Sequence, residues 1–306
     1  MHFNVAEIFK SNENDLADTD NSVRRSMMFV FFAIQILFIP GVAIAQNSAP
    51  KSLFINMINA MDKVQTARYQ LILNERIKDV YKSNKYLTKV QVHPFKVYTF
   101  SLTSNIGAEV LYIEGANNNE AVVNPNRFPW FNLNLSPHSM LVRKGHLFRF
   151  DQSGFAYMSK MFSHYYSSDS VFFVTNLKLM TDTIFDGQLC YRLVLYYPEY
   201  KWRTYTVKKG ETFTTIADKF FLNDYMVMDR NGKTSFSDVS EGEKIIIPVA
   251  FAKKIILSID KSSFLPVQQI LYDDKGLLAV LEFKNLIVNQ PIPAEEFTCE
   301  YKKYGF

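Results

Sequence analysis

Residues 205–248 read YTVKKGETFTTIADKFFLNDYMVMDRNGKTSFSDVSEGEKIIIP. The segment opens on alternating apolar and polar residues, typical of a half-buried strand, and closes on a β-branched run that ends in proline. Between these runs, apolar side chains recur at the spacing of one helix face: Phe213, Ile216, Ala217 and Phe220. Thr212 precedes that face and can cap its first turn. A second short helix is expected over residues 224–230, so the order predicts a βααβ unit.

These landmarks resemble the LysM family. The family pattern is an opening Tyr-x-Val, a Gly-Asp-Thr-Leu turn, an Ile-Ala helix, an Asn after the second helix and a Gly-x-x-Leu-x-Ile-Pro finish. The chain has matching residues, in order, at Tyr205–Val207, Gly210–Phe213, Ile216–Ala217, Asn231 and Gly242–Pro248. Two substitutions are mild, since Glu replaces the usual Asp and Phe replaces the usual Leu in the turn.

The resemblance implies a binding function. LysM modules bind N-acetylglucosamine chains in a shallow groove, so the implied partner is peptidoglycan or a related N-acetylglucosamine polymer. By resemblance, the groove lies between the turn after the first strand and the loop after the second helix. The expected glycan-binding residues are Gly210, Glu211, Thr212 and Phe213 on one side, facing Asn231, Gly232 and Lys233 on the other. With a single copy, affinity is expected to be modest.

The second helix departs from the family in being more apolar. Phe221, Leu222, Met226 and Met228 add a face that can dock against the rest of the chain. The alternative function is therefore an envelope interaction or scaffold protein whose LysM fold no longer binds glycan.

The sequence on either side of residues 204–248 has a strand-rich pattern. A helix is expected over residues 49–65, and another over residues 153–165. Strands are expected over 67–78, 85–93, 96–102, 108–114, 119–124, 171–179, 189–197, 252–260, 265–272 and 277–284, with an irregular stretch at 125–150. The run Asp273–Gly276 predicts a hairpin turn, because glycine supplies the positive φ that a tight turn needs.

This flanking part resembles the LolA/LolB-like lipoprotein-carrier fold. The resemblance rests on element order and on Ile259-Asp260, Phe264-Leu265-Pro266, Tyr272-Asp273, Gly276, Glu282-Phe283, Asn285, Ile292-Pro293 and Glu296-Phe297. It implies an α+β fold, in which an N-terminal helix and a curved antiparallel half-barrel sheet span residues 46–203 and 249–306. The LysM domain is expected as an insert at 204–248. A lipid or lipoprotein ligand would be lined by Tyr98, Phe100 and Tyr112, whose alternative role is ordinary core packing.

The N-terminal region predicts export. After a polar extension at residues 1–23, residues 24–45 carry two arginines, an apolar run and a small-x-small ending, which predicts a signal peptide cleaved after Ala45. The expected location is the periplasm or another exported compartment. The alternative is an inner-membrane anchor, since residues 27–45 approach the length of a spanning helix.

Composition and motifs exclude several other classes of protein. A formal net charge of +4 without basic runs gives no reason to expect nucleic-acid binding. Cys190 and Cys299 stand outside any zinc-type spacing, and in an oxidising compartment they could form a disulfide or remain free. No GxSxG, HExxH, GxxxxGK[ST] or GxGxxG motif occurs, so the protein is expected to be non-enzymatic, with no cofactor and no metal.

Overall fold

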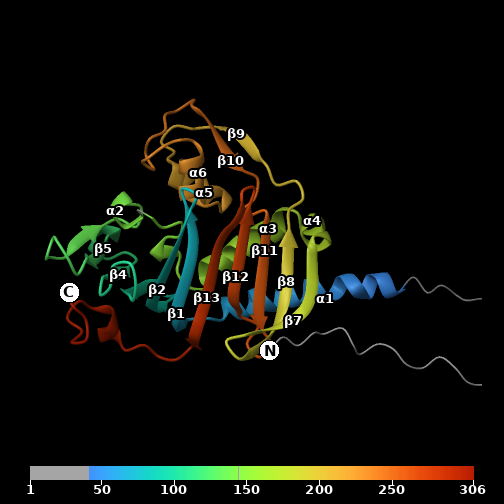
Figure 1. The fold of residues 1–306 in the computed structure, drawn as a ribbon, viewed down its shortest axis with the longest axis horizontal. Helices are drawn as coiled ribbons and strands as arrows, with labels where there is room; N and C mark the ends of the chain where they lie inside the picture. Colours follow the sequence, from blue (N-terminus) through green and yellow to red (C-terminus); the bar gives the residue numbers. More distant parts are fainter. Residues whose placement is uncertain (1–40, 144) are drawn as a thin grey trace, which may run out of the picture. The chain divides into compact units, whose positions relative to one another are not determined.

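The computed structural model of the protein describes residues 41–143 and 145–306, and a long antiparallel sheet dominates them (Figure 1). Its strands in chain order are β1 Thr66–Ile77, β2 Val80–Gln91, β3 Lys96–Ser101, β4 Glu109–Ile113, β5 Ala121–Asn124, β6 Leu133–Leu135, β7 Leu177–Phe185, β8 Gln188–Tyr196, β11 Lys254–Asp260, β12 Pro266–Asp273 and β13 Gly276–Val288. The order across the sheet is β6-β5-β4-β3-β2-β1-β13-β12-β11-β8-β7. With its helices, this confirms an α+β fold with an open antiparallel sheet and an N-terminal helix.

Four helices accompany the large sheet. They are α1 Gly41–Asp62, α2 Met140–Arg143, α3 Ala156–Ser168 and α4 Ser170–Thr175, and short 3-10 turns lie at Asn117–Asn119, Phe150–Gln152 and Ala294–Phe297. The buried side chains of α1 and α3 meet on one face of the sheet, where the rings of Phe54 and Phe162 are 5.7 Å apart, edge to face. This face holds the main core.

A separate two-stranded sheet interrupts the large one. Strands β8 and β11 are hydrogen-bonded neighbours, and Tyr196 pairs with Lys254. The chain between these two residues leaves the large sheet to form β9 Trp202–Thr206 and β10 Lys244–Pro248, which pair with each other alone. The inserted segment therefore begins and ends at paired residues of two neighbouring strands, and the register between β8 and β11 has no irregularity.

The aromatic residues that were expected to line one ligand cavity lie on opposite faces of the sheet. In the β3–β4 pairing, Val97 lies opposite Tyr112 and Tyr98 lies opposite Leu111. Side chains alternate along a strand, so Tyr112 joins the core under the helices, whereas Tyr98 and Phe100 join a second cluster under the C-terminal segment. The prediction that these three residues share one cavity is wrong. Val97 faces the main core, and Tyr98 and Phe100 lie one and three positions after it on the same strand, so they point to the opposite face.

One expected strand is partly a helix. Residues 170–175 form α4, and the strand begins only at Leu177. The Asp169 carboxylate accepts a hydrogen bond from the Phe172 N–H at 2.9 Å and caps the helix. The apolar run Val171–Val174 is compatible with a strand or with a buried helix, and the Asp169 cap favours the helix. The helix places Phe173 against Phe54, with ring centroids 4.7 Å apart.

Most of the predicted signal peptide lies outside the described residues. Only its last five positions, 41–45, are described, and they form the start of α1. Within the part of the chain that the structure describes, no helix combines the length and apolarity needed to cross a bilayer. Cys190 and Cys299 form no disulfide in the structure; Cys190 is buried and Cys299 is partly exposed.

Candidate functional site

The segment around residues 202–248 folds as the expected βααβ unit. Helices α5 Phe213–Phe220 and α6 Asp224–Arg230 lie between β9 and β10. The Thr212 hydroxyl accepts a hydrogen bond from the Thr215 N–H at 3.2 Å, and the Thr215 hydroxyl accepts one from the Thr212 N–H at 2.8 Å. This reciprocal capping box fixes the start of α5 and satisfies two of its free donors. The buried face of α5 and α6 then packs under the two strands.

The first loop of the predicted groove is a tight turn held by Glu211. Gly210 has a φ of +77°, a conformation that side chains with a Cβ rarely adopt. The Glu211 carboxylate accepts hydrogen bonds from the Tyr205 hydroxyl at 2.8 Å and from the Lys208 N–H at 2.8 Å. Partial burial raises the pKa of Glu211, but these hydrogen bonds and the Lys219 ammonium outweigh burial and lower the pKa below its usual value. The carboxylate therefore organises the turn.

The second loop is held by Asn231, just after α6. Its side-chain amide donates to the carbonyls of Val227 at 2.7 Å and Ile246 at 2.8 Å, and accepts from the Ile246 N–H at 2.8 Å. The side chain thus joins the end of α6 to β10. Gly232 follows with a φ of +70°, which turns the chain away from the helix.

The two loops meet directly. The Phe213 N–H donates to the Phe236 carbonyl at 2.9 Å, and both phenyl rings are buried. Lys233 lies in the second loop and pairs with Glu243 at 3.0 Å. All seven predicted groove residues therefore lie on two loops that a backbone hydrogen bond brings together. Thr212, Phe213 and Asn231 use both their side chains and their backbone N–H groups within the fold.

The opposite side of the module packs against the rest of the chain. Leu222, Tyr225 and Met226 are buried there, and the Asn223 amide donates to the Leu147 carbonyl at 2.7 Å. On α3, the Tyr165 hydroxyl donates to the Phe220 carbonyl at 3.0 Å. The apolar second helix thus has the docking role that its sequence suggested.

Two buried arginines anchor the module at this junction. Arg143, at the end of α2, donates to both carboxylate oxygens of Asp224 at 2.8 and 2.9 Å, and its guanidinium lies 5.0 Å from the ring centroid of Phe236. Arg149 donates to Asp218 at 2.7 Å. Burial raises the pKa of Asp224, but Arg143 and Arg149 more than compensate and hold the pKa of Asp224 below its usual range. These pairs tie both helices of the module to the segment that follows α2.

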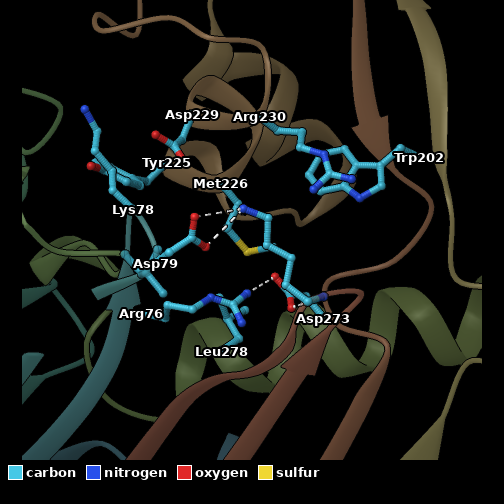
Figure 2. Close-up of a pocket in the computed structure, with 12 residues that line it drawn as sticks. Arg76, Lys78, Asp79, Trp202, Tyr225, Met226, Asp229, Arg230, Asp273 and Leu278 are labelled. Carbon is cyan, nitrogen blue, oxygen red and sulfur yellow. Dashed lines mark hydrogen bonds and ion pairs between the residues drawn. The ribbon is translucent and has the colours of Figure 1, made fainter. Parts of the chain in front are cut away.

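A cavity of about 270 Å³ lies beside α6 at the same junction (Figure 2). The module contributes Trp202, Tyr225, Met226, Asp229 and Arg230, and the hairpins of the large sheet contribute Arg76, Lys78, Asp79, Asp273, Lys275 and Leu278. Most of its charges are neutralised across the cavity: Arg76 pairs with Asp273, and Lys275 pairs with Asp79 at 3.1 Å. The Arg230 guanidinium lies 4.8 Å from the centroid of the Trp202 ring. The cavity is polar and suits water or a small hydrophilic group.

The anchoring arginines are the contribution that sequence reasoning missed. Arg143 and Arg149 fall in the stretch expected to be irregular, and no motif or spacing distinguishes them from other basic residues. Among residues 41–143 and 145–306, no three His, Cys, Asp or Glu side chains are grouped as metal ligands would be.

Comparison with solved structures gives distant likenesses only. A LolA superfamily protein from Nitrosomonas europaea is 11% identical, with a TM-score of 0.34, over 82% of this chain and 98% of the other. The lipoprotein LppX of Mycobacterium tuberculosis is 9% identical, with a TM-score of 0.37, over 80% and 98%. LprF from Mycobacterium bovis is 9% identical, with a TM-score of 0.40, over 80% and 96%. The expected LolA-like relationship thus appears among the structural neighbours, at values too low to bear on a ligand.

Family models match both parts of the chain, whereas no curated protein does. The LysM domain model matches residues 205–248, the same bounds that the sequence motif predicts, so the chain contains a LysM domain. A second model, described as a protein of unknown function (DUF1571), matches residues 64–217, which is half of the chain. The chain therefore belongs to the DUF1571 family.

Proposed function

We propose that the protein is a non-enzymatic component of a bacterial cell envelope that binds the N-acetylglucosamine glycan of peptidoglycan through its LysM domain. The site is the pair of loops made by Gly210, Glu211, Thr212 and Phe213 and by Asn231, Gly232 and Lys233. The observation that carries the proposal is the LysM match together with the Phe213–Phe236 backbone hydrogen bond, which sets the two loops side by side.

The chemistry of the loops suits a neutral sugar. The acetamido group of the sugar needs hydrogen-bond donors and acceptors rather than charge, and the exposed hydroxyl of Thr234 in the second loop can be both. The charged side chains of the loops, Glu211 and Lys233, are already paired within the domain. Because Thr212 and Asn231 maintain the fold, replacing them tests stability as much as binding.

The experiment is therefore a sedimentation assay with variants that block the groove and leave its framework intact. Thr234 is exposed in the second loop, between Lys233 and Phe236. Thr234→Trp is expected to obstruct the groove, and the matched control is Thr181→Trp at another exposed position, on β7. The wild-type and control proteins should pellet with insoluble peptidoglycan, and a soluble N-acetylglucosamine oligomer should release them. If wild type stays in the supernatant, the proposal fails.

An alternative function also has a specific observation in its favour. The Arg143–Asp224 pair and the buried face of α6 fix the domain onto the rest of the chain, as expected of a rigid structural insert. In that case the protein is an interaction or scaffold protein, and peptidoglycan pelleting is absent or insensitive to both the oligomer and Thr234→Trp.

We also propose that the larger part of the chain holds an apolar or lipid ligand, which requires the helices on the sheet to move. The core face of the sheet is filled by α1 and α3, where Phe54, Met57 and Phe162 are almost completely buried. A lipid on this face must displace those helices. Uptake of a fluorescent fatty acid, accompanied by faster amide exchange in α1, is the expected sign of such a ligand, and absence of uptake excludes it.

A further inference from the structure

The loop between β5 and β6, at the β6 end of the large sheet, carries an unusual cluster of exposed aromatic side chains. Phe128 is 83% exposed, Trp130 is 78% exposed and Phe131 is 65% exposed. Single exposed apolar residues are normal, but three large ones within four positions are not. The free-energy cost of keeping them in water points to a partner that covers them.

The base of this loop is fixed. The Asn126 N–H donates to the Asn124 side-chain oxygen at 2.9 Å, and the Asn126 amide donates to the Ile106 carbonyl at 3.0 Å. Ile106 lies in the β3–β4 loop and is itself 72% exposed, so it extends the apolar surface. We call Ile106, Phe128, Trp130 and Phe131 the aromatic patch.

The acidic residue at the base of the loop is buried, since Glu109 accepts hydrogen bonds from the Asn124 amide and the Gly305 N–H, whereas the exposed charges beside the aromatic patch are mostly basic. No Asp or Glu occurs from Ala121 to Phe150, nor from Leu102 to Ala108, and Arg127 is exposed within the loop itself. The C-terminal segment also reaches the loop base, since the Asn124 amide donates to the Gly305 carbonyl at 2.9 Å. Just before that contact lie Lys302 and Lys303, both exposed, after the acidic Glu300.

We infer that the aromatic patch is a membrane-interface anchor that inserts into the headgroup region of an anionic lipid bilayer. Trp and Phe with flanking Arg and Lys are the side chains that prefer this region, because their rings enter the acyl boundary while the cations stay with the headgroups. A bilayer also accounts for exposed rings on a loop whose base is held by hydrogen bonds. This inference is independent of glycan binding, which concerns a different part of the chain.

Trp130 is a direct reporter, because the chain has only one other tryptophan, Trp202. In a Trp202→Phe background, emission from Trp130 should shift to the blue when vesicles of phosphatidylglycerol and phosphatidylcholine are added. Brominated acyl chains should quench it. The experiment uses the full chain as it accumulates in cells. Its N-terminal segment does not confuse the result, because Trp130 emission reports only on the surroundings of the β5–β6 loop. Binding without any change in Trp130 emission overturns the inference.

The matched variant is Phe128→Ser combined with Trp130→Ser and Phe131→Ser. All three side chains are exposed, so the melting temperature should stay unchanged. Its partition onto the anionic vesicles should fall at least about tenfold, since each ring loses the favourable burial of an aromatic side chain. Arg127→Glu should weaken partition in a salt-sensitive way. Equal partition of the triple variant and the wild type contradicts the inference.

The competing occupant is a second copy of this chain. Sedimentation velocity without lipid distinguishes it, because a lipid anchor leaves the protein monomeric at micromolar concentration. A dimer that the triple variant abolishes, with Trp130 emission that depends on protein concentration and not on vesicles, assigns the patch to self-association and overturns the lipid inference.

Discussion

Arg143 and Asp224 form a bidentate ion pair between the end of α2 and the start of α6, with nitrogen–oxygen distances of 2.8 and 2.9 Å. Their side chains are 1% and 4% exposed, so both charges are withdrawn from water. The same atoms make further hydrogen bonds, from Arg143 Nη2 to the Leu147 carbonyl and from the Thr214 hydroxyl to Asp224 Oδ2, whereas Arg143 Nε is buried without a partner among the described residues. The pair therefore holds the LysM domain in place and depends on the presence of both partners.

Removing one partner should be strongly destabilising. Asp224→Asn leaves the guanidinium of Arg143 buried without a counter-charge, so the free energy of unfolding should fall by about 3–5 kcal/mol. Urea unfolding followed by tryptophan fluorescence measures this change. The control is Asp274→Asn, which breaks the more exposed Arg230–Asp274 pair and should cost less than about 1 kcal/mol. Equal effects of the two variants would show that the buried pair has no special role.

The same pair predicts a pH dependence of stability. The pKa of Asp224 is lower in the folded protein than in the unfolded chain, so its contribution is fully present above the unfolded pKa of about 3.9 and is lost as the pH falls through the folded pKa. The difference in unfolding free energy between the wild type and Asp224→Asn should therefore be constant from pH 7 to 5 and shrink below pH 4. A difference that stays constant down to pH 3 contradicts this assignment.

How far the sequence predicts this molecule depends on whether a feature is local. The LysM bounds, the Asp273–Gly276 hairpin and most strands follow from patterns within a few residues, and the structure has them. The motif position of Asn231 predicts a glycan-binding residue, whereas in the structure its side chain bonds to Ile246 in the strand that follows. Arg143 could not be found, because its partner lies 81 residues away and only the fold brings them together. The opposite faces of Tyr98 and Tyr112 likewise depend on register between strands.

The outer face of the sheet gives a further prediction, centred on Lys89. Its ammonium lies 4.9–5.3 Å from the ring centroids of Tyr98, Tyr301 and Tyr304, and it pairs with Glu296 at 2.6 Å. Lys89→Met should lower the free energy of unfolding by about 1–2 kcal/mol, because it removes the cation from the rings and leaves Glu296 with one partner fewer. Urea unfolding measures the loss.

The control for this cluster is Lys302→Met, since Lys302 is exposed and makes no ion pair among the described residues. Its effect should stay within about 0.5 kcal/mol, as for most surface substitutions. If Lys89→Met is equally silent, the C-terminal segment is held by its other contacts, such as the packing of Phe297 and Phe306 with Tyr98 and the Asn124–Gly305 hydrogen bond.

The two cysteines should differ in reactivity. Cys190 is completely buried in β8, whereas Cys299 is partly exposed in the C-terminal segment, and burial raises the pKa of both thiols. The thiolate is the reactive form, so both should react slowly with an aromatic disulfide reagent at pH 7, and Cys299 should react first. Cys299→Ser should abolish the faster phase and Cys190→Ser the phase seen only on unfolding. The measurement is made without reductant on protein isolated from cells. Two titratable thiols in the unfolded protein are expected, and none would show that the cysteines are joined.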